Sequence, residues 1–258
     1  MPFDLILVLG GLVSGMLAGI LGIGGGSVLV PLMVYLGFTP INAIGTSSLA
    51  ISIASLSGSI QNLRMGYIDW RKISALGLPA VFTAQLGAAL ARYIPAHWLL
   101  FGFGTLMLTN IYLVGLKQRS IAIKSSGLAT TRQKLLSSTL TGSLAGLVAG
   151  LVGVGGGAIM VPLQMLLLGE TIKVAIQTSL GVVVLTAVSA TIGHSLNDRV
   201  LFSQGIVLGI GGLLGAQFGT RYLPKLPENV VNNLFRLTLF LISIYSFIQG
   251  LNQLRVDR

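Results

Sequence analysis

Residues 11–31 read GLVSGMLAGILGIGGGSVLVP, and residues 142–162 read GSLAGLVAGLVGVGGGAIMVP. Every glycine and the final proline of the first stretch recur in the second at an offset of 131 positions. The similarity continues at an offset of 132, where AIGTS at 43–47 matches AIQTS at 175–179. The chain therefore consists of two homologous halves, each with three consecutive glycines inside an apolar run. Membrane transporters often build one central site from such a pair of repeats.

Composition places the chain among integral membrane proteins. Of its 258 residues, 53% are hydrophobic and only 9% are charged, and the mean hydropathy is +0.89. A soluble domain has about 25% charged residues, whereas about 20 consecutive apolar residues span a bilayer core. We therefore expect an all-α integral membrane protein with about 8 to 10 hydrophobic helical segments in two homologous halves. Ten apolar runs follow one another, at residues 5–23, 27–37, 41–61, 73–94, 97–116, 135–154, 158–168, 172–194, 203–222 and 230–250.

Two of the ten runs are too short to cross a bilayer alone. They are residues 27–37 and 158–168, and each directly follows a glycine triplet. Backbone that leaves the helical conformation at membrane depth must be buried in protein or line an aqueous cavity. We therefore expect helices that are broken at the glycines or that re-enter the membrane from one side.

Basic residues indicate which helix ends face the cytoplasm. The net charge is +10, but the lysines and arginines lie almost wholly between the apolar runs. This distribution favours the positive-inside rule over nucleic-acid binding and places loops 62–72 and 117–134 in the cytoplasm. We divide the chain into a first repeat at 1–116, a basic cytoplasmic linker at 117–134 and a second repeat at 135–258. The loop charges favour inverted repeats and leave a parallel arrangement open.

The glycine triplets are the leading candidates for a substrate site. Consecutive glycines weaken a helix and release backbone N–H and C=O groups from helical hydrogen bonds. The short helix after each triplet would direct free N–H groups and the positive end of its dipole toward the break, which favours an anion. The alternative is that the glycines only allow helices to cross closely. The six candidate residues are Gly24, Gly25, Gly26, Gly155, Gly156 and Gly157.

Polar side chains inside the apolar runs are the second group of candidates. They can bind an oxyanion through hydrogen bonds, or they can cap a helix and join neighbouring helices. Both uses stay open for the hydroxyl and amide side chains, whereas a structural hydrogen bond is the favoured use of the histidine. The candidates are Thr46, Ser47, Gln85, Gln164, Thr178, Ser179, His194 and Gln217.

Catalytic chemistry finds little support in the apolar runs. The chain has no cysteine, and all six acidic residues lie in loops or at the ends of the runs. No Ser-His-Asp set, carboxylate pair or metal-spaced histidine cluster lies within the runs. We therefore expect no enzymatic activity, no cofactor and no metal site. The expected partners are a small anionic substrate and membrane lipid, but not nucleic acid, and homo-oligomer formation is left open.

Beside these patterns, the sequence resembles a known family. GILGIGGGSVLVP with AIGTS, and GLVGVGGGAIMVP with AIQTS, are similar to the two signature stretches of the sulfite exporter TauE/SafE family. The resemblance covers nearly the whole chain and implies a multi-pass carrier of the bacterial or archaeal inner membrane. It implies small sulfur-containing anions as substrates, such as sulfite, sulfoacetate or other organosulfonates. A passive anion channel and a membrane scaffold without transport fit the composition equally well.

Overall fold

The computed structural model describes residues 2–91, 93–120 and 131–256, and within these residues it contains ten α-helices and no strand. Each predicted apolar run forms one helix, and seven of the helices are long and apolar enough to cross a membrane. The prediction of an all-α membrane protein is therefore confirmed. The helices are α1 (Pro2–Leu21), α2 (Gly26–Tyr35), α3 (Pro40–Arg64), α4 (Trp70–Leu90), α5 (Ala96–Ser120), α6 (Thr131–Val152), α7 (Gly157–Leu167), α8 (Ile172–Ser195), α9 (Phe202–Tyr222) and α10 (Glu228–Val256), with a short 3₁₀ helix at Leu223–Lys225.

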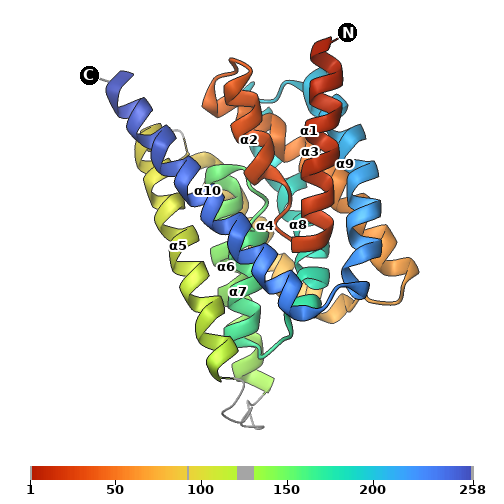
Figure 1. Ribbon diagram of the computed structural model, residues 1–258. Coiled ribbons are helices and arrows are strands. Elements are labelled where there is room, and N and C mark those ends of the chain that lie inside the picture. The colour runs from red at the N-terminus through yellow and green to blue at the C-terminus, as the bar shows by residue number, and fades with distance from the viewer. Residues whose placement is uncertain (1, 92, 121–130, 257–258) are drawn as a thin grey trace.

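The helices of the two halves are interleaved rather than packed as two separate bundles. Helix α1 of the first half packs against α9 of the second, and the repeat-related α6 packs against α4. The long, mostly buried helices α3 and α8 pack against each other in the centre. Helices α5 and α10 lie side by side along one flank (Figure 1). Because the helices of the first half pack mainly against helices of the second, the two halves share their core.

Small residues bring the backbones of α1 and α9 into direct contact, and those of α6 and α4 likewise. A Cβ atom added to Gly15 would overlap the carbonyl oxygen of Gly212, and one added to Gly146 would overlap the carbonyl oxygen of Ala80. Close backbone approach increases van der Waals contact where the surrounding lipid supplies no hydrophobic driving force. These two helix pairs therefore form closely packed walls on either side of α3 and α8.

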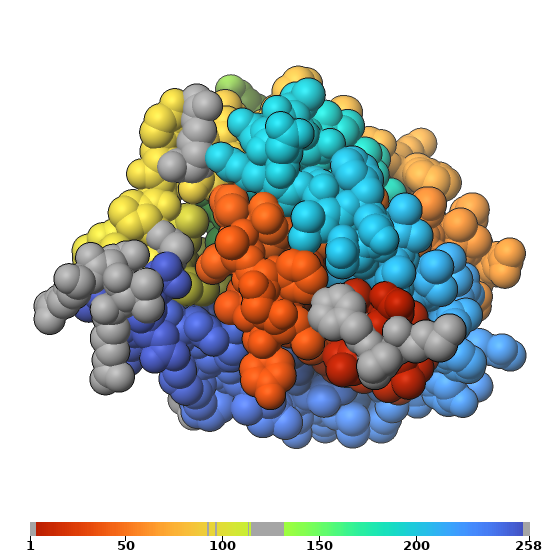
Figure 2. Space-filling model, turned by 90° about the horizontal axis from the view of Figure 1, so that it is seen from above, coloured from red at the N-terminus to blue at the C-terminus, as the bar shows by residue number. Residues whose placement is uncertain are grey.

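Both glycine triplets break the helix that precedes them, as predicted. Helix α1 ends at Leu21 and α2 begins at Gly26, and the residues between include left-handed glycines, such as Gly24 at φ 87°. The same turn recurs between α6 and α7, with Gly155 at φ 82°. After the first break the chain reverses, and α2 runs back beside α1 toward the face that carries the N-terminus (Figures 1 and 2). Helices α2 and α7 have only 10 and 11 residues, so neither crosses the molecule.

The two ends of the molecule carry different parts of the chain. Helix α1 begins and helix α10 ends at the top of Figure 1, whereas α5 ends and α6 begins at the bottom. We call the end with both termini the terminal face. Most of the predicted linker, residues 121–130, lies outside the described residues, and α5 and α6 extend into the rest of it. The division into two repeats with a cytoplasmic linker and the inversion of the repeats stay predictions.

Candidate functional site

The two glycine breaks meet in the centre of the molecule, backbone against backbone. A Cβ atom added to Gly24 would lie 2.9 Å from the carbonyl oxygen of Val154 and 3.4 Å from the Cα of Gly155. The side chains of Ile51 in α3 and Val183 in α8 close the contact from the sides, because they lie 3.3 and 3.1 Å from a Cβ added to Gly155. In this conformation no space for an oxyanion remains between the two turns. We call this contact the glycine crossing.

Two of the predicted hydroxyl residues each donate a hydrogen bond to the glycine turn of the opposite half. Ser47 in α3 donates a hydrogen bond of 3.1 Å to the carbonyl oxygen of Gly153, in the second-half turn. Its repeat counterpart Ser179 in α8 donates one of 3.2 Å to the carbonyl oxygen of Gly22, in the first-half turn. All four residues are buried. Each central helix therefore holds the broken helix of the opposite half.

Two further hydroxyl groups make the glycine crossing asymmetric, and both escaped the sequence analysis. Ser14 in α1 donates a hydrogen bond of 2.8 Å to the carbonyl oxygen of Gly25, whereas its counterpart in the second half is Ala145. Thr186 in α8 donates one of 3.3 Å to the carbonyl oxygen of the first glycine in the second triplet, whereas its counterpart is Ala54. Comparison of the repeats position by position would have revealed both differences.

Helices α2 and α7 both begin at the glycine crossing. Gly25 and Gly156 precede them in the left-handed conformation, at φ 80° and 73°. The carbonyl oxygen of Gly25 accepts hydrogen bonds from the N–H groups of Val28 and Leu29, so the first turn of α2 is regular. The first N–H groups of a helix have no acceptor within the helix itself. Two sets of backbone donors and two positive dipole ends therefore meet in the centre of the molecule.

The predicted glutamines join helices. Gln85 Nε2 donates to the carbonyl oxygen of Ser189 at 2.6 Å and ties α4 to α8. The repeat-related Gln217 Nε2 donates to the carbonyl oxygen of Ser57 at 3.2 Å and ties α9 to α3. Gln164 Nε2 donates to a carbonyl oxygen of α8 at 3.3 Å. None of these three bonds involves the glycine turns.

The remaining predicted side chains lie in the core of the bundle. Thr46 Oγ1 accepts a hydrogen bond of 3.0 Å from the N–H group of Leu201, in the turn between α8 and α9. His194 Nε2 lies 3.2 Å from the carbonyl oxygen of Gly150, which can only accept, so Nε2 carries the proton. Thr178 is buried in α8. The structure thus brings the six glycines, Ser47 and Ser179 to one place, and it gives Thr46, His194 and the glutamines other hydrogen-bond partners.

A cavity of about 310 Å³ opens on the terminal face. Seen from above, the surface is hollowed between α2 and the beginning of α5 (Figure 2). Two lining residues connect the cavity to the glycine crossing, because Ile44 contacts Gly153 and Val152 directly precedes it. The cavity therefore reaches the crossing from one side. We call it the terminal-face cavity.

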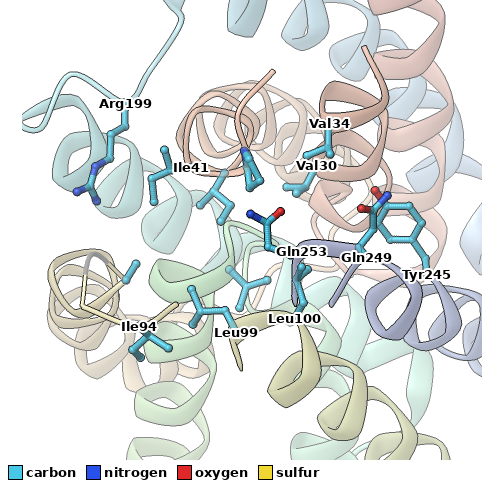
Figure 3. A pocket seen from close by; sticks show the side chains of 14 residues that line it. Val30, Val34, Ile41, Ile94, Leu99, Leu100, Arg199, Tyr245, Gln249 and Gln253 are labelled. Carbon is cyan, nitrogen blue, oxygen red and sulfur yellow. The ribbon is translucent and has the colours of Figure 1, made fainter. Parts of the chain in front are cut away.

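Among the described residues, the polar lining of the terminal-face cavity consists of Arg199, Tyr245, Gln249 and Gln253 (Figure 3). Arg199 lies in the turn between α8 and α9, and it is the one charged residue among those described lining residues. The other three residues lie on α10 at intervals of four, which is the spacing of a helix face. This spacing could have been found in the sequence, whereas nothing there distinguishes Arg199 from the other arginines between apolar runs.

Three repeat counterparts of the cavity lining are buried in the core. Val34, Ile44 and Val152 of the lining correspond to Met165, Ile176 and Leu21, which are at most 4% exposed; Val34 is partly exposed, whereas Ile44 and Val152 are 8% and 9% exposed at the floor of the cavity. The three counterparts belong to one hydrophobic cluster, together with Met107, Phe235 and Leu239, and this cluster reaches Val152. We call this cluster the apolar plug. The glycine crossing thus has an open cavity on one side and a closed core on the other.

Comparison with known proteins places these features in a family. A family model described as "Sulfite exporter TauE/SafE" matches residues 7–246. A probable membrane transporter protein of Bacillus subtilis, YunE, is 26% identical, over 97% of this chain and 99% of its own length. A probable membrane transporter protein of Xylella fastidiosa is 31% identical, over 92% and 91%, and one of Haemophilus influenzae is 29% identical, over 96% and 99%.

Proposed function

Because the chain belongs to the sulfite exporter TauE/SafE family of membrane transporters, we propose that it is a secondary transporter of small sulfur-containing anions. Sulfite, sulfoacetate and other organosulfonates are the proposed substrates. The protein is a multi-pass membrane protein, and the family supplies the general activity. The choice of anion is our inference from the donor groups around the glycine crossing.

The proposal of a transporter rests on the glycine crossing, which borders a cavity on one side and the apolar plug on the other. A carrier needs a central site that is exposed to one side of the membrane at a time. The crossing supports such a site, because two helix N-termini meet there and their free N–H groups favour an anion. We propose that a rocking motion separates the two turns, and that the anion passes between them.

The proposed donors are the backbone N–H groups of Gly25, Gly26, Gly156 and Gly157. Ser47 and Ser179 would add hydroxyl groups once the turns separate and their present bonds to the turns break. Such an exchange of hydrogen-bond partners loses no donor during the motion. The predicted contribution of Thr46, Thr178, His194 and the three glutamines to anion binding stays a proposal, and it requires most of them to exchange their present hydrogen-bond partners.

The distribution of basic residues supports an orientation for the proposed carrier. The turn between α3 and α4 and the end of α5 carry the two basic loops, and both lie away from the terminal face. The positive-inside rule would then place the terminal face outside the cell. Helix α1 begins at the terminal face and its repeat counterpart α6 begins at the opposite end, which supports inverted repeats (Figure 1).

Transport in proteoliposomes tests the proposal. Purified protein should accumulate sulfite or an organosulfonate against its concentration gradient when a proton or sodium gradient is imposed. Accumulation distinguishes a carrier from a channel, which only dissipates gradients, and any flux distinguishes both from a scaffold. Absence of flux for sulfite and for all organosulfonates tested would overturn the proposal.

A matched pair of glycine variants tests the role of the crossing. Gly24 and Gly37 both have a positive φ, 87° and 93°, but a Cβ at Gly24 would meet the opposite turn and one at Gly37 would meet nothing within 4 Å. Gly24→Ala should therefore lower the transport rate by about tenfold or more, at a backbone strain of about 1 kcal/mol that Gly37→Ala shares. Equal transport by the two variants would contradict a functional crossing.

A further inference from the structure

We propose that polar groups in the last turns of α1, α3 and α9 bind a sodium ion, and that this ion drives the proposed transport. The site consists of the side-chain oxygens of Asn62 and Thr220 and the carbonyl oxygen of Gly19, and we call it the helix-end site. Only the coupling rests on the proposed transport function, because ion binding can be measured without any flux. The helix-end site offers oxygens to a cation, whereas the glycine crossing offers N–H groups to an anion.

Helices α1 and α9 bring two of the three groups together. The two helices run parallel, because Gly15 lies against Gly212 and, one turn further along each helix, Gly19 lies against Ala216 and Thr220. A Cβ atom added to Gly19 would lie only 2.5 Å from the backbone nitrogen of Thr220. The last turns of α1 and α9 are therefore in direct contact.

Helix α3 brings Asn62 to the same place. It runs parallel to α9, because Leu49 lies against Gly205 and, further along both helices, Gly58 lies against Thr220. A Cβ atom added to Gly58 would lie 2.9 Å from the hydroxyl oxygen of Thr220. Asn62 follows Gly58 by four residues, so it lies on the same face of α3, one turn closer to the end of the helix.

Three helix C-termini give the helix-end site a negative potential. Helices α1, α3 and α9 end at Leu21, Arg64 and Tyr222, each two residues after its site residue. A helix C-terminus carries a partial charge equivalent to about −0.5 elementary charge. Arg64 and Arg221 lie in the last turns as well, but both are exposed, where water and salt screen their charge. The buried ends of the three helices therefore favour a cation between them.

Both side chains of the helix-end site are buried and unpaired. Asn62 is 1% exposed and Thr220 is fully buried. The two amide atoms of Asn62 and the hydroxyl oxygen of Thr220 have no hydrogen-bond partner within residues 2–91, 93–120 and 131–256. Gly19 is among the last four residues of α1, whose carbonyl oxygens lack a donor within the helix. Unpaired buried polar atoms are costly, and a cation compensates their oxygens.

The second half fills the corresponding place with its own side chains. The counterparts of Gly19, Asn62 and Thr220 are Gly150, His194 and Ala88. His194 Nε2 donates to the carbonyl oxygen of Gly150 at 3.2 Å, so the last turn of α6 has a donor there. The alanine brings no side-chain oxygen. The first half has a shorter amide and an added hydroxyl group in these positions, so the oxygens that suit a cation occur at one end of the molecule.

The donor set selects a small monovalent cation. No metal site is expected from the sequence, and the described residues contain no group of three or more His, Cys, Asp or Glu side chains that could hold a metal ion. Calcium and magnesium sites use carboxylates, whereas neutral side-chain and last-turn carbonyl oxygens suit sodium. The close contact of the three helices favours sodium over the larger potassium ion.

Binding of radioactive sodium to the full chain in nanodiscs tests this inference. The titration is carried out at constant ionic strength, with choline as the replacing cation. We expect saturable binding, with potassium competing at least about tenfold less well than unlabelled sodium. Absence of saturable binding, or equal competition by potassium and sodium, would overturn the assignment of a sodium ion.

Variants locate the ion. Thr220→Val keeps the shape of the side chain and should weaken sodium binding by about tenfold or more, whereas Thr220→Ser keeps the hydroxyl group and should retain most of it. Thr141→Val is the matched control, since Thr141 in α6 is also fully buried with an unpaired hydroxyl group. If Thr220→Val does not yield a monodisperse protein, Asn62→Leu should weaken binding by a similar factor. Unchanged affinity in either variant of the site, or an equal loss in Thr141→Val, would overturn the proposal.

Flux of sulfite in proteoliposomes tests the coupling separately. A sodium gradient should drive accumulation, and Thr220→Val should raise the sodium concentration that half-maximal flux requires by about tenfold. Accumulation that a proton gradient drives without sodium would reject the coupling and keep the transporter. Sodium binding that depends on Thr220, without flux of any anion tested, would keep the helix-end site and reject the transporter.

Discussion

The terminal-face cavity and the apolar plug occupy repeat-related positions, yet one is open and the other is closed. Val34 and Met165 are counterparts at an offset of 131, but the first lines a cavity and the second is 4% exposed in a packed core. These two counterparts thus adopt two different packings in one molecule. A repeat protein can exchange the two packings between its halves, and such an exchange would move the opening from one face to the other.

Polar contacts at the plugged end support the same interpretation. Lys72 at the start of α4 forms an ion pair of 2.6 Å with Glu170, in the turn between α7 and α8. Lys173 Nζ donates a hydrogen bond of 3.0 Å to the carbonyl oxygen of Pro224, after α9. The second contact joins α8 to the 3₁₀ helix next to Ile172 and Leu223 of the apolar plug. The first joins α4 to the turn after α7, next to a separate hydrophobic cluster that contains Ile73 and Met160.

The largest expected effect comes from removing a side chain of the plug. Phe235 is fully buried, whereas Phe240, five residues later in α10, is 48% exposed. Phe235→Ala should lower the free energy of unfolding by about 3 to 5 kcal/mol, because it leaves a cavity in the core. Phe240→Ala should change it little. Thermal unfolding in detergent measures both, and equal losses would show that the plug is no more tightly packed than the lipid-facing surface.

A smaller effect is expected from the hydroxyl groups that hold the glycine crossing. Ser47→Ala and Ser179→Ala should each cost about 0.6 to 1 kcal/mol of stability, the usual range for one interhelical hydrogen bond. Their effects should be similar, because the two bonds are reciprocal. Ser48→Ala is the control, since the buried Ser48 donates at 3.0 Å to the carbonyl oxygen of Ile44 in its own helix. Thermal unfolding of the three variants is compared, and a loss in Ser48→Ala as large as in the other two would refute the special role of the crossing.

Much of the fold could be predicted from the sequence. The ten apolar runs became ten helices, and the glycine triplets broke them where expected, because hydrophobic length and loss of helix propensity act locally. The short helices begin at Gly26 and Gly157, one residue earlier than the runs suggested, since the preceding glycines take the left-handed conformation. These features depend on few long-range contacts.

The site could be predicted only in part. The sequence indicated that Gln85 and Gln217 would either join helices or meet a ligand, and only packing decides between these uses. It also could not tell which copy of a repeated pattern is open, because both halves carry the same pattern. Opening is a property of the conformational equilibrium of the whole molecule. Arg199 escaped notice for a related reason, since its place in a cavity depends on how α2, α5 and α10 come together.

Cysteine accessibility tests the central claim, that the glycine crossing is open toward the terminal face and closed toward the other. The chain has no cysteine, so Val34→Cys and its repeat counterpart Met165→Cys would each carry a single thiol. A membrane-impermeant methanethiosulfonate reagent is added to each side of oriented membranes in turn. We expect Val34→Cys to react rapidly from the terminal face and Met165→Cys to be protected from both sides, with a rate at least about tenfold lower. Equal modification of the two cysteines, or faster modification of Met165→Cys, would contradict this claim.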